Sequence, residues 1–184
     1  MIEIRTLTEH DMLQAMELKV QCWTEELAGQ CENTLSVNHE YDFWIEWMRS
    51  AKENHDLRLL IGAFERKQML GVAFASFAES SDISSGGIEL NGLWVYPDQR
   101  GRGVSQRLIL HLLTFYLKMG MERIVIYKHH YAPSNTFYQK LGAQVVRQDQ
   151  QMAGRLLVDV FMADIWDMKE RINQSLSRRI SMPE

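Results

Sequence analysis

The most informative stretch of this chain is LWVYPDQRGRGVSQRL, residues 93–108. An apolar, β-prone run ends at Pro97, a short loop carries Gly101 and Gly103, and a helical pattern begins at Val104. A strand, a glycine-rich turn and a helix N-terminus in series bring backbone N–H groups and the positive end of a helix dipole to one point. Glycine permits the tight turn and the close approach of a phosphate to the main chain. The stretch therefore predicts a site for a phosphate or pyrophosphate group.

The loop differs from the two common nucleotide-binding loops. No Gly-Lys-Ser/Thr follows it, which excludes a P-loop. The dinucleotide pattern Gly-x-Gly-x-x-Gly fails at Gln106, and a meander of strands before the loop does not suit a βαβ unit. Positive charge is added by Arg100, Arg102 and Arg107. A ligand that carries phosphate is therefore expected, whereas a nucleotide-phosphate binder is disfavoured.

The bulk composition is that of one ordinary soluble domain. The chain has 184 residues, of which 46% are hydrophobic and 24% charged. The formal net charge of −4 argues against a nucleic-acid partner. No apolar run approaches the ~20 residues that span a bilayer, and the N-terminus does not resemble a signal peptide. The two cysteines, Cys22 and Cys31, fit free thiols in a reducing cytosol, so we expect a cytoplasmic protein without a membrane partner.

Hydrophobic periodicity predicts an α+β chain with a mixed sheet. Strands are expected at 2–7, 57–64, 69–78, 88–95, 122–128, 143–147 and 156–163, and helices at 9–27, 37–52, 104–118, 134–141 and 166–180. Residues 79–87 are expected to form a flexible loop. We expect one domain over residues 1–165 and a C-terminal helical extension over 166–184. That last helix would pack on the domain or on a second subunit, which leaves a homodimer open.

Two segments resemble the GNAT superfamily of acetyl-CoA-dependent N-acetyltransferases. The pattern Arg100-x-x-Gly103-x-Ser105 resembles motif A of that family, whose consensus is Gln/Arg-x-x-Gly-x-Gly/Ala. Residues 137–142, FYQKLG, resemble a second family segment downstream. Ser105 departs from the consensus, but its backbone N–H can still donate to phosphate. The resemblance implies the GNAT fold: a mixed, mostly antiparallel sheet of about seven strands flanked by helices.

The resemblance also implies how acetyl-CoA would be held. The loop would bind its pyrophosphate through Arg100, Gly101, Arg102, Gly103, Val104 and Ser105. Main-chain groups of the strand end would bind the pantetheine arm and polarise the thioester, and they belong to Leu93, Trp94 and Val95. The family often places an asparagine at the position of Tyr131, and here the nearest asparagine is Asn135. No metal is expected.

Two side chains are candidates for proton transfer. Tyr138 falls on the family tyrosine that protonates the leaving thiolate, although a purely structural aromatic is the alternative. Glu89 corresponds to a catalytic glutamate of histone-type members and, by strand alternation, shares a face with Asn91, Leu93 and Val95. A solvated carboxylate is the alternative there, and a water wire from Glu89 or Asn91 would also remove the amine proton.

His129 and His130 form a pair that invites a base or a metal site. No third ligand occurs at matching spacing, so a solvated loop pair is the favoured interpretation.

The resemblance implies that the first two helices and the loop between them shape the acceptor side. Here that region combines acidic and aromatic residues. Such a mixture suits a cationic amine through charge pairing and cation–π contact. The commoner alternative is a pair of amphipathic helices with tryptophans inward and carboxylates outward. The residues concerned are Trp23, Glu25, Glu26, Glu32, His39, Glu40, Tyr41, Asp42, Trp44 and Trp47.

The sequence thus predicts an N-acetyltransferase that moves acetyl from acetyl-CoA directly to a primary amine. Direct transfer is preferred because neither cysteine lies in a motif that marks a nucleophile. A catalytically silent acyl-CoA-binding or regulatory module on the same fold is the alternative. The sequence does not identify the acceptor.

Overall fold

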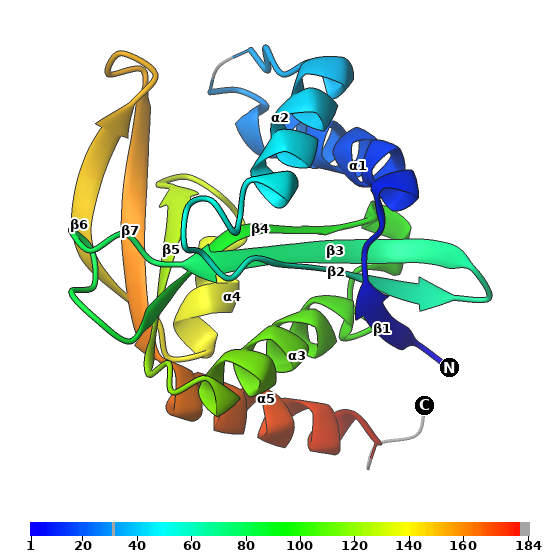
Figure 1. Ribbon diagram of the computed structural model, residues 1–184, viewed down its shortest axis with the longest axis vertical. Coiled ribbons are helices and arrows are strands. Elements are labelled where there is room, and N and C mark those ends of the chain that lie inside the picture. Colours follow the sequence, from blue (N-terminus) through cyan, green and yellow to red (C-terminus); the bar gives the residue numbers. More distant parts are fainter. Residues whose placement is uncertain (31, 181–184) are drawn as a thin grey trace. The chain divides into compact units, whose positions relative to one another are not determined.

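The computed structural model describes residues 1–30 and 32–180. Its strands form a seven-stranded sheet in the order β1-β2-β3-β4-β5-β7-β6 (Figure 1). Five of the neighbouring strand pairs have a described register, and of these only β4–β5 is parallel. The strands are β1 (Glu3–Thr6), β2 (Leu59–Glu65), β3 (Gln68–Phe77), β4 (Gly87–Val95), β5 (Arg123–His129), β6 (Gln144–Gln151) and β7 (Leu156–Asp164). The predicted mixed sheet is confirmed.

The helices are α1 (Glu9–Leu27), α2 (Val37–Arg49), α3 (Val104–Lys118), α4 (Asn135–Lys140) and α5 (Ile165–Ile180), with a short 3₁₀ turn η1 (Pro97–Gln99). The C-terminal helix and the bounds of α1 and α3 agree with the sequence prediction. A capping box between Thr8 and Asp11 begins α1. Helix α2 ends at Arg49, earlier than predicted. The N–H of the next residue, Ser50, still bonds to the Glu46 carbonyl, and residues 51–55 then form turns. Among the described residues, no helix combines the length and the apolar character needed to cross a membrane.

The chain divides into two compact units. The first contains Met1–Phe77 and Gly92–Leu108, and the second contains Ala78–Asn91 and the chain from Ile109 onward. Strand β4 and helix α3 contribute to both units. The prediction of one domain over residues 1–165 stays a prediction, and the two units are described separately.

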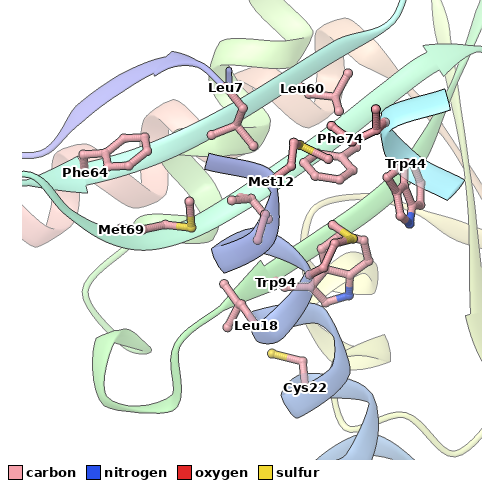
Figure 2. Close-up of a cluster of buried hydrophobic side chains, with 14 residues drawn as sticks. Leu7, Met12, Leu18, Cys22, Trp44, Leu60, Phe64, Met69, Phe74 and Trp94 are labelled. Atoms are coloured by element: carbon pink, nitrogen blue, oxygen red, sulfur yellow. The ribbon is translucent and has the colours of Figure 1, made fainter. Parts of the chain in front are cut away.

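In the first unit, α1 and α2 pack against β2, β3 and the end of β4 around an aromatic core (Figure 2). Trp44 of α2 lies edge-on to Phe74 of β3 and Trp94 of β4, at ring-centroid distances of 5.1 and 6.3 Å. Met12 and Met16 of α1 are fully buried in the same cluster. Edge-to-face packing of this kind holds Trp94, at the end of β4, against α2 and β3.

In the second unit, the first residues of β4 pair with β5 in parallel, from Gly87↔Arg123 to Glu89↔Val125. Strand β7 pairs with β5 and β6 in antiparallel fashion. The prediction of a flexible loop at 79–87 is wrong in one respect, because its Ile83 packs into an apolar cluster with Val125 and Val160. The loop is anchored where that side chain is buried.

Candidate functional site

The predicted turn lies in the first unit, between β4 and α3. Gly101 and Gly103 both have a φ of 78°, in the left-handed region that a side chain disfavours. Helix α3 begins at the next residue, Val104, and the first turn of a helix leaves backbone N–H groups without intrahelical partners. The predicted series of strand, glycine turn and helix N-terminus is therefore confirmed as geometry.

The first arginine of the turn contacts the chain on both sides. The Arg100 guanidinium donates from Nε to the Val95 carbonyl at 3.2 Å and from Nη2 to a Glu25 carboxylate oxygen at 2.7 Å. The same Nη2 lies 3.6 Å from the buried thiol of Cys22. Arg100 therefore ties the turn to the end of β4 and to the last turns of α1.

Arg102 is held in a similar way. Its Nη2 donates to Glu65 at the end of β2, at 2.9 Å, and its Nη1 donates to Gln99. Ser105 lies half-buried in the first turn of α3. The turn is thus fixed by carboxylates on two different elements, and its arginines retain positive charge beside the α3 N-terminus.

The strand that enters the turn is well fixed. Trp94 and Val95 are buried, and Leu93 is half-buried. A Cβ on Gly71 of β3 would lie 2.7 Å from the Trp94 carbonyl oxygen, so only glycine permits this approach of the two strands. The predicted alternation of side chains along β4 is visible as alternating burial as far as Leu93. It breaks at Val95, which is buried like its neighbour Trp94.

In the second unit, Glu89 is the last residue of β4 that pairs with β5. Its side chain is half-buried, with buried Ile88 and Leu90 on either side. Asn91 follows on the same face of the strand, and its side-chain oxygen Oδ1 is buried without a hydrogen-bond partner. A carboxylate and an unsatisfied amide oxygen thus lie two residues apart on one strand.

Tyr138 lies on α4 in the second unit and is only 4% exposed. Its ring packs against Phe137 and, at a centroid distance of 6.2 Å, against Phe161 of β7. The packing fixes the ring on α4, and it is compatible with both the acid and the structural interpretation of Tyr138.

Asn135 fixes the start of α4. Its side-chain Nδ2 donates to the carbonyls of His129 and His130 at 3.1 and 2.9 Å. Its Oδ1 is buried and has no hydrogen-bond partner. Tyr131, at the usual family asparagine position, is 63% exposed, and its ring packs edge-to-face against that of His130. The unsatisfied amide oxygen in this region thus belongs to Asn135, four residues after Tyr131.

The interpretation of His129 and His130 as a solvated pair is wrong. His129 is the last residue of β5 and is 3% exposed. The His130 Nδ1 lies 3.0 Å from both carboxylate oxygens of buried Asp159, which also accepts a hydrogen bond from Gln148 at 2.8 Å. The two rings have different environments because antiparallel pairing with β7 brings Asp159 beside His130. Among the described residues, no group of three His, Cys, Asp or Glu side chains is suited to hold a metal ion.

A buried ion pair joins α1 and α2 in the first unit. The Lys19 ammonium pairs with Glu40, and the Trp44 indole N–H donates to the same carboxylate at 3.0 Å. The ammonium also lies 5.0 and 5.4 Å from the ring centroids of Trp44 and Trp94. Sequence reasoning missed this pair, although helical spacing puts Lys19 on the same face as Met12 and Met16. Burial lowers the Lys19 pKa, and Glu40 partly offsets that effect.

The second unit contains a polar network that was also missed. The Tyr127 hydroxyl donates to Asp82 at 2.7 Å and accepts from Arg147 Nη2 at 2.6 Å. Arg147 pairs with Asp82 and Asp149 as well. Burial and the neighbouring Asp82 raise the pKa of Tyr127 to about 12. Asp82 thus fastens the 78–86 segment to β5 and β6.

Comparison with known proteins defines the class. A family model described as the acetyltransferase (GNAT) family matches residues 14–143. The chain belongs to this family and is an acyltransferase. A search of curated protein sequences finds no match.

Solved structures with the same fold share little sequence. The PaiA N-acetyltransferase of Thermoplasma acidophilum, in complex with coenzyme A, is 21% identical, with 89% of this chain and 99% of that chain covered and a TM-score of 0.71. The ribosomal-protein-alanine N-acetyltransferase of Brucella melitensis is 16% identical (88% and 99% covered, TM-score 0.68). A phosphinothricin acetyltransferase of Sinorhizobium meliloti, in complex with acetyl-CoA, is 17% identical (89% and 88% covered, TM-score 0.67). The names of the last two specify different acceptors, so the shared fold does not select one.

Proposed function

We propose that the protein transfers an acetyl group from acetyl-CoA directly to a primary amine of a small molecule or peptide. The observation that carries this proposal is the turn of Gly101 and Gly103, with positive φ at both residues, leading into α3. That geometry suits a pyrophosphate, and Arg100 and Arg102 add positive charge to it. Solved structures of the same fold hold coenzyme A or acetyl-CoA.

Asn135 supports the same donor. Because its Nδ2 is used on two backbone carbonyls, its buried Oδ1 is left to accept a hydrogen bond. A buried amide oxygen without a partner is costly, and a ligand amide N–H would relieve that cost. The pantetheine arm of acetyl-CoA carries such amides, and we assign Asn135 to that arm.

The reaction forms one C–N bond and breaks one C–S bond. The amine nitrogen attacks the thioester carbonyl carbon, and negative charge develops on the carbonyl oxygen. In our proposal, main-chain groups of 93–95 stabilise this charge, Glu89 accepts the proton that the amine loses, and Tyr138 donates a proton to the departing thiolate. The products are an N-acetylated amine and coenzyme A.

Direct transfer is favoured over an acyl-cysteine intermediate. Cys22 is 3% exposed, and burial raises the pKa of its thiol, which opposes the thiolate that a nucleophile needs. Cys31, the other cysteine, lies outside the described residues. A ternary complex of both substrates therefore accounts for the reaction without a covalent enzyme.

The acid and aromatic residues of α1 and α2 give a cationic acceptor less support than the sequence did. Glu40 is buried against Lys19, and Glu25 is paired with Arg100. Both carboxylates are therefore already engaged by cations of the chain itself. The acceptor is therefore proposed only as a primary amine, and the cytoplasmic location and the homodimer stay predictions.

The proposal is tested by measuring the release of coenzyme A with a thiol reagent. Purified protein is incubated with acetyl-CoA and, in separate reactions, spermidine, kanamycin, phosphinothricin or a peptide with N-terminal alanine. Amine-dependent thiol release, with the acetylated amine seen by mass spectrometry, is the expected result. Binding of acetyl-CoA without turnover of any amine would instead identify the silent binding module. Binding of ATP or NAD, without binding of acetyl-CoA, would contradict both.

A further inference from the structure

Asn91 carries an unsatisfied polar group inside the second unit. Its Oδ1 is buried and accepts no hydrogen bond, and no hydrogen bond of its Nδ2 occurs within residues 1–30 and 32–180. Leaving a buried amide oxygen unpaired is costly, so such groups are rare in folded proteins. The structure tolerates this cost on a strand that is otherwise well packed.

The position of Asn91 on β4 relates it to the proposed base. Burial alternates along the strand, with half-buried Glu89 and Asn91 separated by buried Leu90. The two side chains therefore project from the same face, two residues apart. Glu89 is also in register with Val125 of β5, and Val125 and Tyr127 lie in one apolar cluster. The side chain that carries the orphaned oxygen is therefore the next one after the Glu89 carboxylate on this face of β4.

We propose that Asn91 binds the acceptor amine, an inference that rests on the proposed function. Its Oδ1 accepts one N–H of the amine, while the other N–H proton passes to Glu89 as the C–N bond forms. The hydrogen bond to Asn91 remains in the product, where the nitrogen of the new amide keeps that one N–H. Holding one N–H and removing the other orients the nitrogen lone pair toward the thioester carbon.

This arrangement makes Asn91 a specificity residue for primary amines. A secondary amine has a single N–H, which must be lost to Glu89, so nothing remains for the amide oxygen to accept. A site built around a hydrogen bond rejects an analogue that lacks it, because the polar group then stays unpaired. The wild-type protein should therefore prefer an amine over its N-methyl analogue.

The test uses Asn91→Leu, which is similar in volume and has no acceptor oxygen, and Asn91→Asp, which keeps one. Kinetics are measured with whichever panel amine gives turnover and with its N-methyl analogue. Loss of one hydrogen bond should raise the acceptor KM of Asn91→Leu about tenfold and abolish the preference for the primary amine. Affinity for acetyl-CoA should stay within about twofold of wild type. Asn91→Asp should keep the preference.

Thermal unfolding separates this role from a structural one. Removing an orphaned group should leave the Asn91→Leu midpoint unchanged or higher. The matched control is Asn173→Leu on α5, whose amide donates to Glu170 at 3.4 Å, and it should keep the preference for the primary amine. Asn91→Ala replaces Asn91→Leu if the leucine variant does not fold.

Three outcomes would overturn the inference. They are an unchanged preference in Asn91→Leu, a weakened affinity for acetyl-CoA with an unchanged acceptor KM, and an equal loss of preference in Asn173→Leu. If the wild-type protein turns over none of the panel amines, the proposed function fails and this inference fails with it. If the wild-type protein turns over an amine and Asn91→Leu keeps the wild-type preference for the primary amine, the inference fails and the proposed function stands.

Discussion

Arg100 and Glu25 form an ion pair that links the glycine turn to the last turn of α1, with Nη2 and Oε2 2.7 Å apart. Arg100 also donates to the Val95 carbonyl, and the Cys22 thiol lies beside the same guanidinium. The residue that begins the family motif is therefore anchored by α1 and by β4. Its remaining nitrogen, Nη1, makes none of these contacts, so one arginine can hold the turn and still present charge to a pyrophosphate.

Arg100→Met should weaken acetyl-CoA binding about tenfold, because it removes both the anchor and the charge. Stability should fall by at most about 1 kcal/mol, since both partners of the pair are substantially exposed and the pair is screened by solvent. Isothermal titration gives the affinity, and urea unfolding gives the free energy.

Arg100→Lys tests whether the planar, branched group matters as well as the charge. It should bind acetyl-CoA better than Arg100→Met but more weakly than wild type, because lysine keeps the charge but lacks the planar fork whose separate nitrogens reach Val95 and Glu25. Lys118→Met, at the far end of α3, removes a charge without a described ion pair and should leave the affinity unchanged. Equal affinities for wild type and Arg100→Met would contradict the assignment.

The ion pair of Lys19 and Glu40 leads to a prediction about stability. Lys19→Met alone should cost about 3–5 kcal/mol, because it leaves the Glu40 carboxylate buried beside apolar rings. The double variant Lys19→Met with Glu40→Leu should recover most of this loss, since no uncompensated charge remains. Urea denaturation measures both, and Arg49→Met, whose pair with Glu9 is exposed, is the control. Equal losses for Lys19→Met and Arg49→Met would contradict a buried pair.

Local signals account for what the sequence predicted well. Helical spacing predicted the bounds of α1, and Gly103 before a helical pattern predicted the start of α3. The missed features join residues distant in sequence, such as Lys19 with Glu40 and His130 with Asp159. Strand pairing and helix packing decide those contacts, and no local pattern contains them. Tyr131 illustrates the limit, because the sequence names Asn135 as the nearest asparagine but only the structure shows that its Oδ1 is buried without a hydrogen-bond partner.

Tyr127 should determine part of the alkaline stability of the fold. Its pKa is raised from 10.0 to about 12, so between these values the folded state holds a proton that the unfolded state has lost. The stabilisation is complete below about pH 10 and is lost as the pH rises through about 12. Tyr127→Phe should flatten the decline in unfolding free energy over that range. Tyr131→Phe, an exposed tyrosine, is the control, and an unchanged slope in Tyr127→Phe would contradict the network.

Tyr138→Phe tests the proposed acid. If the hydroxyl protonates the leaving thiolate, kcat should fall by about 10²-fold or more while acetyl-CoA affinity is kept, because the ring and its packing on Phe161 are preserved. Donors with a more acidic leaving thiol need less protonation and should rescue part of the loss. Turnover equal to wild type would leave Tyr138 as a structural aromatic, and unfolding measurements on the same variant show whether the packing survives.

Glu89→Gln tests the proposed base through the pH profile rather than the rate alone. A carboxylate that accepts the amine proton produces an acidic limb in kcat/KM, because its protonation removes activity. The amide variant keeps the size and the half-buried position on β4 but cannot take up a proton, so the acidic limb should shift or disappear. Glu122→Gln, exposed just before β5, is the matched control and should keep the wild-type profile. If Glu89→Gln has a lower rate but an unshifted limb, Glu89 positions the amine or a water, and the proton leaves by another route.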